Sequence, residues 1–549
     1  MPESTVEFEL KFLVPVDARR ALRAALGERG ARTEARHLVA RYFDTGDRRL
    51  ASAGMALRLR REGRSWVQTL KAGGEAALAR FEHEVLRPGA DLDPAVHAGT
   101  QAGDTMAALL ADGESLRQRY ETDIRRTTRT LRTRGAVVEL AFDEGRIATH
   151  DRELRVCELD FERLSGSPAA LFALAERWRA RFGLIVDPRS KAERGDALAE
   201  GRAPASPRRA TPVRLRRKVG VGEAWRSVLD ECIAQIVVNA IALGIAVGVE
   251  GRAGRSTASS PPVDDVEVVH QLRIGLRRLR SAIRLFRGWV PSIDESIASG
   301  ARELFRALGA SRDRDVLAQD IEPALQRAGA PGAPTADGRA GPTDANDVAA
   351  VVADDATQRW LLALLAWRHG LDAAAAPEAG IVEAAAGSSA GSGAGSSDDS
   401  ASGSTAASAV GSGSIPSASA TLAPLARRRL ARWQRAIASE APRFAQLDDT
   451  ARHLLRRRAK RLRYASEFVE SLFGGKEMRR FVESLRAAQQ ALGELGDLVL
   501  AGQRYGRESA VEPRDWFVQG WLAARRDALV AQAAAALAEL DGRRPFGKR

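Results

Sequence analysis

The chain has 549 residues, which exceeds one ordinary domain and predicts two to four units that each bury a core. Its formal net charge of +13 favours polyanionic partners such as nucleic acid, acidic lipid headgroups or polyphosphate, although an Arg-rich composition alone gives the same excess. Cys157 and Cys232 are the only cysteines, which excludes a disulfide framework and a Cys-based zinc site.

The N-terminal part predicts a β-rich domain. From residue 6 to 164, short runs of residues alternate between polar and apolar, which is the period of half-buried strands. Apolar residues return to a spacing of three and four at residues 17–29, 104–110 and 169–182, where we expect helices that cover the sheet. The first ten residues lack the basic start and apolar run of a signal peptide, so we expect a cytoplasmic location.

Five of the predicted strands have one charged face. Glu7, Glu9 and Lys11 lie two residues apart and therefore point to the same side of a strand. The same alternation recurs in four further strands, whose charged residues are Arg58, Arg60, Arg80, Glu82, Glu84, Glu139, Asp143, Glu158, Asp160 and Glu162. The period does not decide whether these faces meet water, as in an ordinary antiparallel sheet, or an enclosed interior.

The C-terminal part predicts a helical bundle. Residues 201–222 contain prolines and arginines without an apolar period and predict a linker, whereas apolar stripes at helical spacing follow over residues 223–545. Two stretches rich in Ala, Gly, Ser and Pro, residues 329–346 and 373–421, predict disordered insertions. The apolar stretch at residues 233–249 contains polar residues and is short for a bilayer, so we expect a buried helix and no membrane.

The helical part contains an internal repeat. A histidine is followed by basic residues three, seven and ten positions later, and this pattern occurs twice: His270, Arg273, Arg277 and Arg280, then His453, Arg456, Lys460 and Arg463. Each copy is followed by Leu-Gly and a short loop that ends in Asp, at residues 308–313 and 492–497. A basic stripe on one helix is usually a solvated face, but a solvated face has no reason to repeat this spacing. The repeat predicts a duplicated bundle.

In chain order, seven short motifs of the N-terminal part resemble the CYTH superfamily of triphosphate tunnel metalloenzymes. They are VEFELK from residue 6, YFDT at 42–45, LRLR at 57–60, TLK ending at 71, RFEHE from 80, ELDFE from 158 and SK at 190–191. The resemblance covers about residues 4–200 and implies a CYTH domain at residues 1–200. In that family an antiparallel barrel turns its charged faces inward. The expected fold is therefore α+β, with an N-terminal antiparallel β-barrel and flanking helices before the all-α bundle.

The resemblance also implies roles for the charged residues. Lys and Arg would hold the phosphoryl oxygens of a triphosphate, and carboxylates beside such an anion make sense as ligands of Mg²⁺ or Mn²⁺. The expected catalytic residues are Glu7, Glu9, Lys11 and Lys71. The expected substrate-binding residues are Arg41, Arg58, Arg60, Arg80, Arg126 and Lys191, although the sequence leaves open whether Arg125 or Arg126 faces inward. The expected metal ligands are Glu7, Glu9, Glu158, Asp160 and Glu162.

The segments HQLRIGLRRLR from residue 270 and HLLRRRAKRLRY from residue 453 resemble the CHAD domain, a helical domain that binds inorganic polyphosphate. The resemblance covers about residues 223–540 without the two insertions. Paired basic helices would neutralise such a chain and release its counterions. The implied polyphosphate-binding residues are His270, Arg273, Arg277, Arg280, Arg284, His453, Arg456, Lys460 and Arg463.

Hydrolysis of inorganic triphosphate, combined with polyphosphate binding, is the leading hypothesis because both parts would then serve related ligands. The alternatives are another CYTH activity, adenylate cyclase or thiamine triphosphatase, and a non-catalytic polyphosphate-binding scaffold. Nucleic-acid binding ranks last because aromatic residues make up 5% of the chain and none interleaves with the Arg stripes. Association with polyphosphate granules in the cytoplasm would suit the leading hypothesis.

Overall fold

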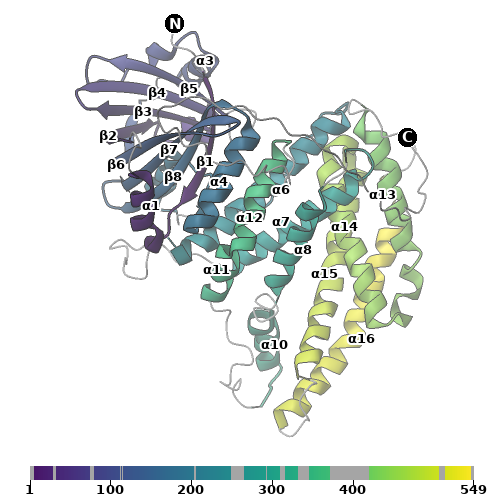
Figure 1. Ribbon diagram of the computed structural model, residues 1–549. Coiled ribbons are helices and arrows are strands. Elements are labelled where there is room, and N and C mark those ends of the chain that lie inside the picture. The colour runs from purple at the N-terminus through teal and green to yellow at the C-terminus, as the bar shows by residue number, and fades with distance from the viewer. Residues whose placement is uncertain are drawn as a thin grey trace, which may run out of the picture.

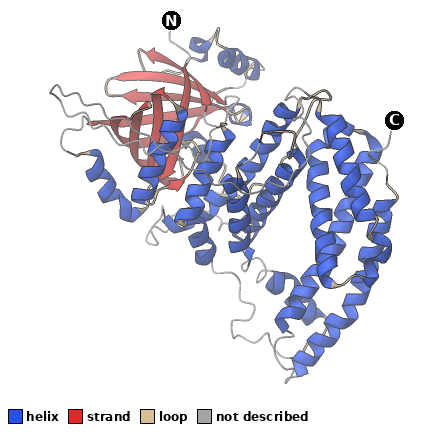
Figure 2. Cartoon of the chain, turned by 45° about the vertical axis from the view of Figure 1, so that its right-hand side comes forward, coloured by secondary structure: helices blue, strands red, loops and turns tan. Residues whose placement is uncertain are grey.

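The computed structural model describes residues 5–28, 33–73, 79–111, 113, 115–202, 206–248, 265–291, 294–309, 316–331, 345–370, 420–505, 513–543 and 545. Figure 1 shows a β domain joined to a long helical domain, and Figure 2 shows the strands gathered at one end of the molecule. The predicted α+β architecture is confirmed.

The β domain is one closed antiparallel barrel. Its strands are β1 (Thr5–Leu13), β2 (Thr33–Asp44), β3 (Met55–Glu62), β4 (Ser65–Gly73), β5 (Ala79–Arg87), β6 (Arg117–Arg132), β7 (Ala136–Ala148), β8 (Glu153–Gly166) and β9 (Ile185–Val186). Their order is β5-β4-β3-β2-β6-β7-β8-β1-β9, and an additional pairing of β5 with β1 closes the barrel. Closure creates an interior, so the alternating strand faces no longer both meet water.

Helices cover the outer face of the barrel. They are η1 (Val16–Ala18), α1 (Arg19–Leu26), α2 (Arg49–Ser52), η2 (Pro94–His97), α3 (Gln101–Leu109), α4 (Pro168–Phe182) and α5 (Lys191–Ala199). Leu10 and Phe12 of β1 are buried in the same core as Leu171 and Trp178 of α4, because burial of apolar surface drives this packing. The apolar side of the strands therefore faces outward, and the charged side is left for the interior.

The helical domain contains the predicted amphipathic helices. They are α6 (Val221–Gly248), α7 (Asp265–Phe286), α8 (Glu295–Ala307), η3 (Leu317–Ile321), α10 (Glu322–Arg327), α11 (Ala345–Ala353), α12 (Asp355–Arg368), α13 (Leu422–Ala438), η4 (Ala441–Gln446), α14 (Asp449–Phe473), α15 (Gly475–Tyr505) and α16 (Pro513–Asp541). Helix α11 begins at Ala345, within the last two residues of the predicted insertion at 329–346. Residues 332–344 and 373–419 lie outside the described residues.

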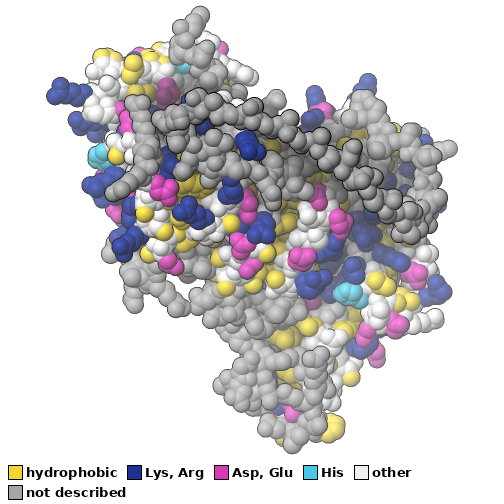
Figure 3. Space-filling view, in the orientation of Figure 1, with side chains coloured by type: hydrophobic (Ala, Val, Ile, Leu, Met, Phe, Trp, Pro, Cys, Tyr) yellow, Lys and Arg dark blue, Asp and Glu magenta, His cyan; other side chains and the backbone are white. Residues whose placement is uncertain are grey.

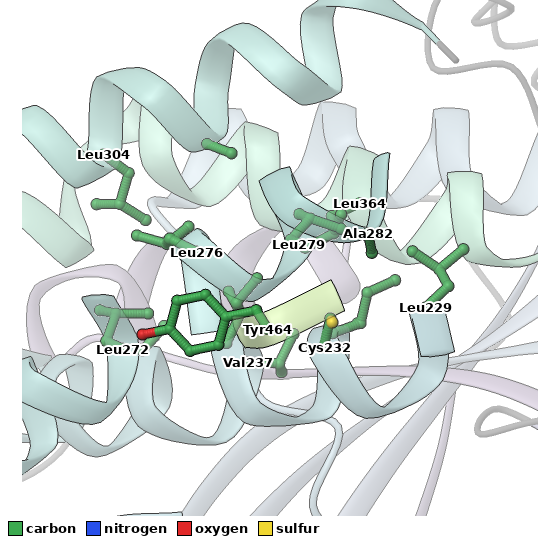
Figure 4. Packing of buried hydrophobic residues seen from close by; sticks show 14 of the residues in the cluster. Leu229, Cys232, Val237, Leu272, Leu276, Leu279, Ala282, Leu304, Leu364 and Tyr464 are labelled. Atoms are coloured by element: carbon green, nitrogen blue, oxygen red, sulfur yellow. The ribbon is translucent and has the colours of Figure 1, made fainter. Parts of the chain in front are cut away.

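Buried apolar stripes hold these helices together. On α7, Leu272, Leu276 and Leu279 are fully buried, and Figure 4 shows them packed near Cys232 of α6 and Tyr464 of α14. The segment Val221–Gly244 of α6 is long and apolar enough to cross a bilayer, yet 72% of its most apolar window is buried inside the protein. Burial is the reason for its apolar composition, as expected of a core helix.

The two domains share one continuous core. Arg179 of α4 is buried and donates to Asp355 of α12 at 2.7 Å, and the backbone N–H of Val186 donates to Gln358 Oε1 of α12 at 2.9 Å. The predicted linker is also packed, because Leu215 and Val219 are buried against the helical domain. The few apolar side chains of this segment are too irregularly spaced to produce a period in the sequence.

Candidate active site and basic surface

The barrel encloses a cavity of about 850 Å³ that is lined by charged side chains of both signs. The cations are Lys11, Arg58, Arg60, Lys71, Arg119, Arg126, Arg163 and Lys191, and the carboxylates include Glu9, Glu82, Glu84, Asp143, Asp160 and Glu162. Strand alternation places them there, because the intervening apolar residues occupy the covered outer face. A cavity of this composition can hold a small polyanion together with a cation.

Strand β1 contributes Glu9 and Lys11. The Lys11 ammonium contacts Glu9 and also donates to Asp160 Oδ2 of β8 at 2.9 Å. Burial raises the pKa of Glu9, but the positive charges of Lys11 and Lys71 outweigh burial and lower it to about 2. Glu9 is therefore an ionised acceptor at neutral pH.

Three buried carboxylates form an acidic cluster on β7 and β8. Asp143 pairs with Glu158 across the two strands, and Asp160 follows two residues later on the same face. Ligand oxygens of all three lie within 4.8 Å of one another. Burial raises the pKa of Asp160 to about 7, because Lys11 and Lys191 only partly offset burial and the nearby Glu158 charge. Asp160 Oδ1 is buried and has no hydrogen-bond partner within the described part of the chain.

Helix α5 closes the barrel beside this cluster. Lys191 and Arg194 both contact Glu158, and Lys191 Nζ lies 2.6 Å from Asp143 Oδ2. The helix starts with a capping box in which Ser190 and Glu193 exchange hydrogen bonds, which fixes Lys191 at its first position. Close packing requires Gly195, because a Cβ there would lie 2.2 Å from the Tyr120 ring.

The opposite wall is rich in arginine. Arg58 of β3 lies 3.2 Å from both Glu82 and Glu84 of β5, and Lys71 of β4 lies 2.6 Å from Glu82. Arg60 contacts Glu62 and Glu84. The Nε atoms of Arg58 and Arg60 are buried without a hydrogen-bond partner among the described residues. Both residues line the cavity, so their guanidinium groups can donate to an anion there.

Neighbouring strands decide the orientation of the arginines that the sequence left ambiguous. Arg126 pairs with Asp143 across β6 and β7, and its guanidinium donates to both Asp143 oxygens at 2.7 and 2.8 Å. Arg125 is exposed on the other face. The inclusion of Arg41 requires correction, because it lies on the face of β2 opposite the cavity-lining Tyr42 and its guanidinium packs over Trp66 at 5.8 Å.

Two expected site residues, Glu7 and Arg80, are paired across β1 and β5, but their side chains lie outside the described ones. Glu162 lines the cavity as expected. The expected set of metal ligands omitted Asp143, although the sequence already placed this residue on the charged face of its strand. It also omitted Arg194, which no pattern in the sequence separated from other basic residues of a helix start.

In the helical domain, α7 packs against α14. We give the name basic groove to the basic residues along this contact, which are Arg273, Arg277, Arg280 and Arg284 of α7 and Arg456, Arg457, Lys460 and Arg461 of α14. Arg280 lies near Arg457, and Arg461 lies near Arg284; burial together with these neighbouring positive charges lowers the pKa of Arg280 and of Arg461. Phe305 of α8 supports the groove, with the guanidinium carbons of Arg273, Arg277 and Arg280 at 4.2, 4.9 and 5.7 Å from its ring centroid. Figure 3 shows Lys and Arg side chains gathered over α8, α14 and α15.

The two copies of the repeat have equivalent geometry. A Cβ on Gly309 would lie 3.7 Å from Arg273 Nη1, and one on Gly493 would lie 3.9 Å from Arg456 Nη2. Each Leu-Gly pair thus passes close to the first arginine of its own copy. Arg456 also donates to an Asp497 oxygen at 3.3 Å, beside Gly496, where a Cβ would lie 2.0 Å from Arg456 Nη1.

The orientation of α14 about its own axis decides which of its cations face α7. Arg463 is paired with Glu467 at 2.6 Å and contacts Gln489 of α15. Arg457 and Arg461 instead face α7, and neither has a carboxylate partner among the described residues. His453 is exposed, and His270 is half-buried.

Lys460 is the most perturbed cation of the basic groove. Burial and the neighbouring charges of Arg277 and Arg456 lower its pKa to about 6, which Asp497 only partly opposes. Burial and the charges of Arg284 and Arg457 lower the pKa of Arg461 to about 10. The groove is therefore electrostatically unfavourable without an anion.

Comparisons with known proteins match both parts of the chain. The family model of the CYTH domain matches residues 5–195, and that of the CHAD domain matches residues 257–506. An inorganic triphosphatase from Haemophilus influenzae is 29% identical over 161 residues, which are 29% of this chain and 44% of that protein. The chain thus spans less than half the length of this curated relative.

Two solved structures align with separate parts of the chain. The crystal structure of the CHAD domain from the plant Ricinus communis aligns with a TM-score of 0.41 and 23% identity, over 60% of this chain and 96% of that one. A putative adenylate cyclase from Bacillus halodurans aligns with a TM-score of 0.25 and 19% identity, over 35% of this chain and 96% of that one.

Proposed function

Because residues 5–195 belong to a CYTH domain and residues 257–506 to a CHAD domain, we propose that this protein hydrolyses inorganic triphosphate in its barrel and binds inorganic polyphosphate in its basic groove. The observation that carries the enzymatic proposal is the enclosed cavity in which cations from several strands surround a buried acidic cluster. The similarity to an inorganic triphosphatase over the CYTH part supports the choice of substrate.

The acidic cluster fits a divalent metal ion. Asp143, Glu158 and Asp160 offer hard oxygen ligands within 4.8 Å of one another, and the buried Asp160 Oδ1 has no other partner among the described residues. These three residues would hold Mg²⁺ or Mn²⁺, with Glu9 and Glu162 nearby on the cavity wall. A bound metal ion would supply positive charge next to the phosphoryl oxygens of the substrate.

The remaining residues of the cavity can bind the substrate and orient water. Arg58, Arg60 and Lys71 on one wall can donate to phosphoryl oxygens, and the same donors stabilise negative charge on the pyrophosphate that leaves. Glu9 is ionised, so it can accept a hydrogen bond from the water that attacks the terminal phosphorus. The reaction needs no covalent intermediate with the protein.

Phosphate release tests this proposal. With Mg²⁺ or Mn²⁺, we expect the full chain to release phosphate from tripolyphosphate faster than from ATP or thiamine triphosphate, and EDTA to abolish release. Faster release from thiamine triphosphate would instead indicate a thiamine triphosphatase, and formation of cyclic AMP from ATP would indicate an adenylate cyclase. No turnover of any of the three would favour a non-catalytic scaffold.

Substitution Lys71→Ala is expected to raise KM for tripolyphosphate by about 10-fold to 100-fold, because a charge-assisted hydrogen bond contributes about 1.5–3 kcal/mol. The turnover number should change less, since Lys71 lies across the cavity from the acidic cluster. Steady-state kinetics of this variant and of Lys218→Ala, an exposed lysine of the connecting segment, provide the comparison. Equal KM values for both variants would show that Lys71 does not bind the substrate.

Polyphosphate binding in the basic groove is expected to take up a proton near pH 8. Lys460 is neutral there in the free protein because its pKa is about 6, and a bound phosphate chain would raise this pKa. Affinity should therefore fall as pH rises above 6. Titration calorimetry in buffers of different ionisation enthalpy measures the uptake, which Lys460→Arg should abolish. Persistent uptake in that variant would assign the proton to another group.

A further inference from the structure

Helix α13 presents a second run of arginines that no motif of the sequence marked. It contains five arginines and no acidic residue. Arg428, Arg432 and Arg435 are exposed and lie on one face, since they are four and three residues apart. None of the three forms an ion pair within the described part of the chain. Like charges at this spacing destabilise a helix, so an anion on this face would relieve the repulsion.

The fold attaches helix α13 to one end of the basic groove. Arg429 of α13 donates to the backbone oxygens of Leu285 and Arg287 at the end of α7, both at 2.7 Å, and its guanidinium packs over Trp289 at 3.8 Å. These contacts hold α13 beside the C-terminal end of α7, where the row of basic residues on that helix ends.

Arg461 of α14 links the two surfaces. Its guanidinium lies 5.8 Å from the ring centroid of Trp433 on α13, and burial together with the charge of Arg284 on α7 lowers its pKa. Arg280, Arg284, Arg457 and Arg461 have no carboxylate partner among the described residues. The unpaired cations therefore continue from α7 and α14 onto α13.

We propose that Arg428, Arg432 and Arg435 extend the basic groove, so that one polyphosphate chain held between α7 and α14 continues across α13. This inference rests on the proposed binding of polyphosphate in the groove. The groove is about 16 Å long from Arg273 to Arg284, at 1.5 Å for each helical residue. A chain of that length is held by the groove alone, and only a longer chain reaches α13. The extension thus makes the protein selective for long chains.

The aromatic residues along this path favour a phosphate chain over a nucleic acid. Single-stranded nucleic acids bind by stacking bases on open aromatic rings. Trp289 is buried beneath Arg429, and Trp433 is half-buried beside Arg461. A guanidinium group packs against each of these two rings, so the rings are not open for stacking by bases, whereas the arginines around them can bind phosphate.

The test compares short and long polyphosphate on the full chain in EDTA, which prevents hydrolysis, using the triple variant Arg428→Gln, Arg432→Gln and Arg435→Gln. We expect its affinity for long chains to fall at least 10-fold. The slope of log affinity against log salt concentration should become shallower by about two to three, because each lost phosphate contact reduces this slope by about one. Affinity for a chain that matches only the groove should stay unchanged. The matched control replaces Arg64, Arg132 and Arg134, three exposed arginines of the barrel, by Gln. The cavity is the same in all variants, so its contribution cancels.

Unchanged affinity for long chains, or an equal loss for both lengths, would overturn the extension. The variant Arg280→Glu with Arg457→Glu separates the two proposals, because it should weaken both lengths if the groove binds polyphosphate. Normal binding by that variant would refute the groove itself. If oligothymidine binds as tightly as long polyphosphate and depends equally on the α13 arginines, the assignment of the partner to phosphate chains is wrong.

Discussion

Substitution Asp160→Asn is expected to lower the turnover of tripolyphosphate by at least about 100-fold, because even the groups that support metal ligands change activity by 10-fold to 100-fold. Asp160 belongs to the acidic cluster, and its buried Oδ1 lacks a partner among the described residues. Asparagine keeps the shape but removes the charge that a divalent cation needs. Phosphate release at saturating Mg²⁺ or Mn²⁺ measures the loss.

The same substitution is expected to stabilise the metal-free protein at pH 8. Burial raises the pKa of Asp160 to about 7, so the folded state binds a proton more readily than the unfolded chain, and stability is lost as pH rises from about 4 through 7. Asparagine removes this loss, and the thermal midpoint in EDTA should rise. The control Asp151→Asn, on an exposed turn of the barrel, should change neither quantity. Wild-type turnover in the Asp160 variant would contradict the proposed metal site.

Charge reversal in the basic groove is expected to have a comparably large effect on polyphosphate binding. The pair Arg280→Glu and Arg284→Glu on α7 should lower affinity by about 100-fold or more, since two charge-assisted contacts of about 1.5–3 kcal/mol each are lost. The pair Arg457→Glu and Arg461→Glu on α14 should do the same, because the two helices face each other. Calorimetry of the full chain gives affinity and stoichiometry together.

Stoichiometry distinguishes one shared groove from two surfaces. In a shared groove, either pair of substitutions weakens all binding. In two independent surfaces, each pair would instead remove half of the sites and leave the affinity of the rest unchanged. The control Arg132→Glu with Arg134→Glu alters the net charge equally on an exposed part of the barrel. A loss in this control equal to that of either groove pair would mean that only net charge matters.

The periodicities of the sequence marked five strands of the β domain, three of its helices and the amphipathic helices of the bundle. Alternation with a period of two marked the strands that carry Glu9, Arg58 and Asp160, and the 3.6-residue period marked the helices of the bundle. The repeated histidine and arginine spacing predicted a duplicated bundle, and its two basic helices, α7 and α14, pack against each other. These features could be predicted because each depends on neighbours that are close in sequence.

Tertiary structure decided which side chains meet. Alternation alone does not say which face of a strand lies inside. The pairing of β5 with β1 closed the barrel, and the packing of the apolar faces against α4 left the charged faces for the interior. Closure and register placed Arg126 against Asp143 and turned Arg41 outward onto Trp66. On α14, rotation about the helix axis brought Arg457 and Arg461 toward α7. Strand pairing and helix rotation depend on contacts between residues far apart in the chain, and no local period encodes them.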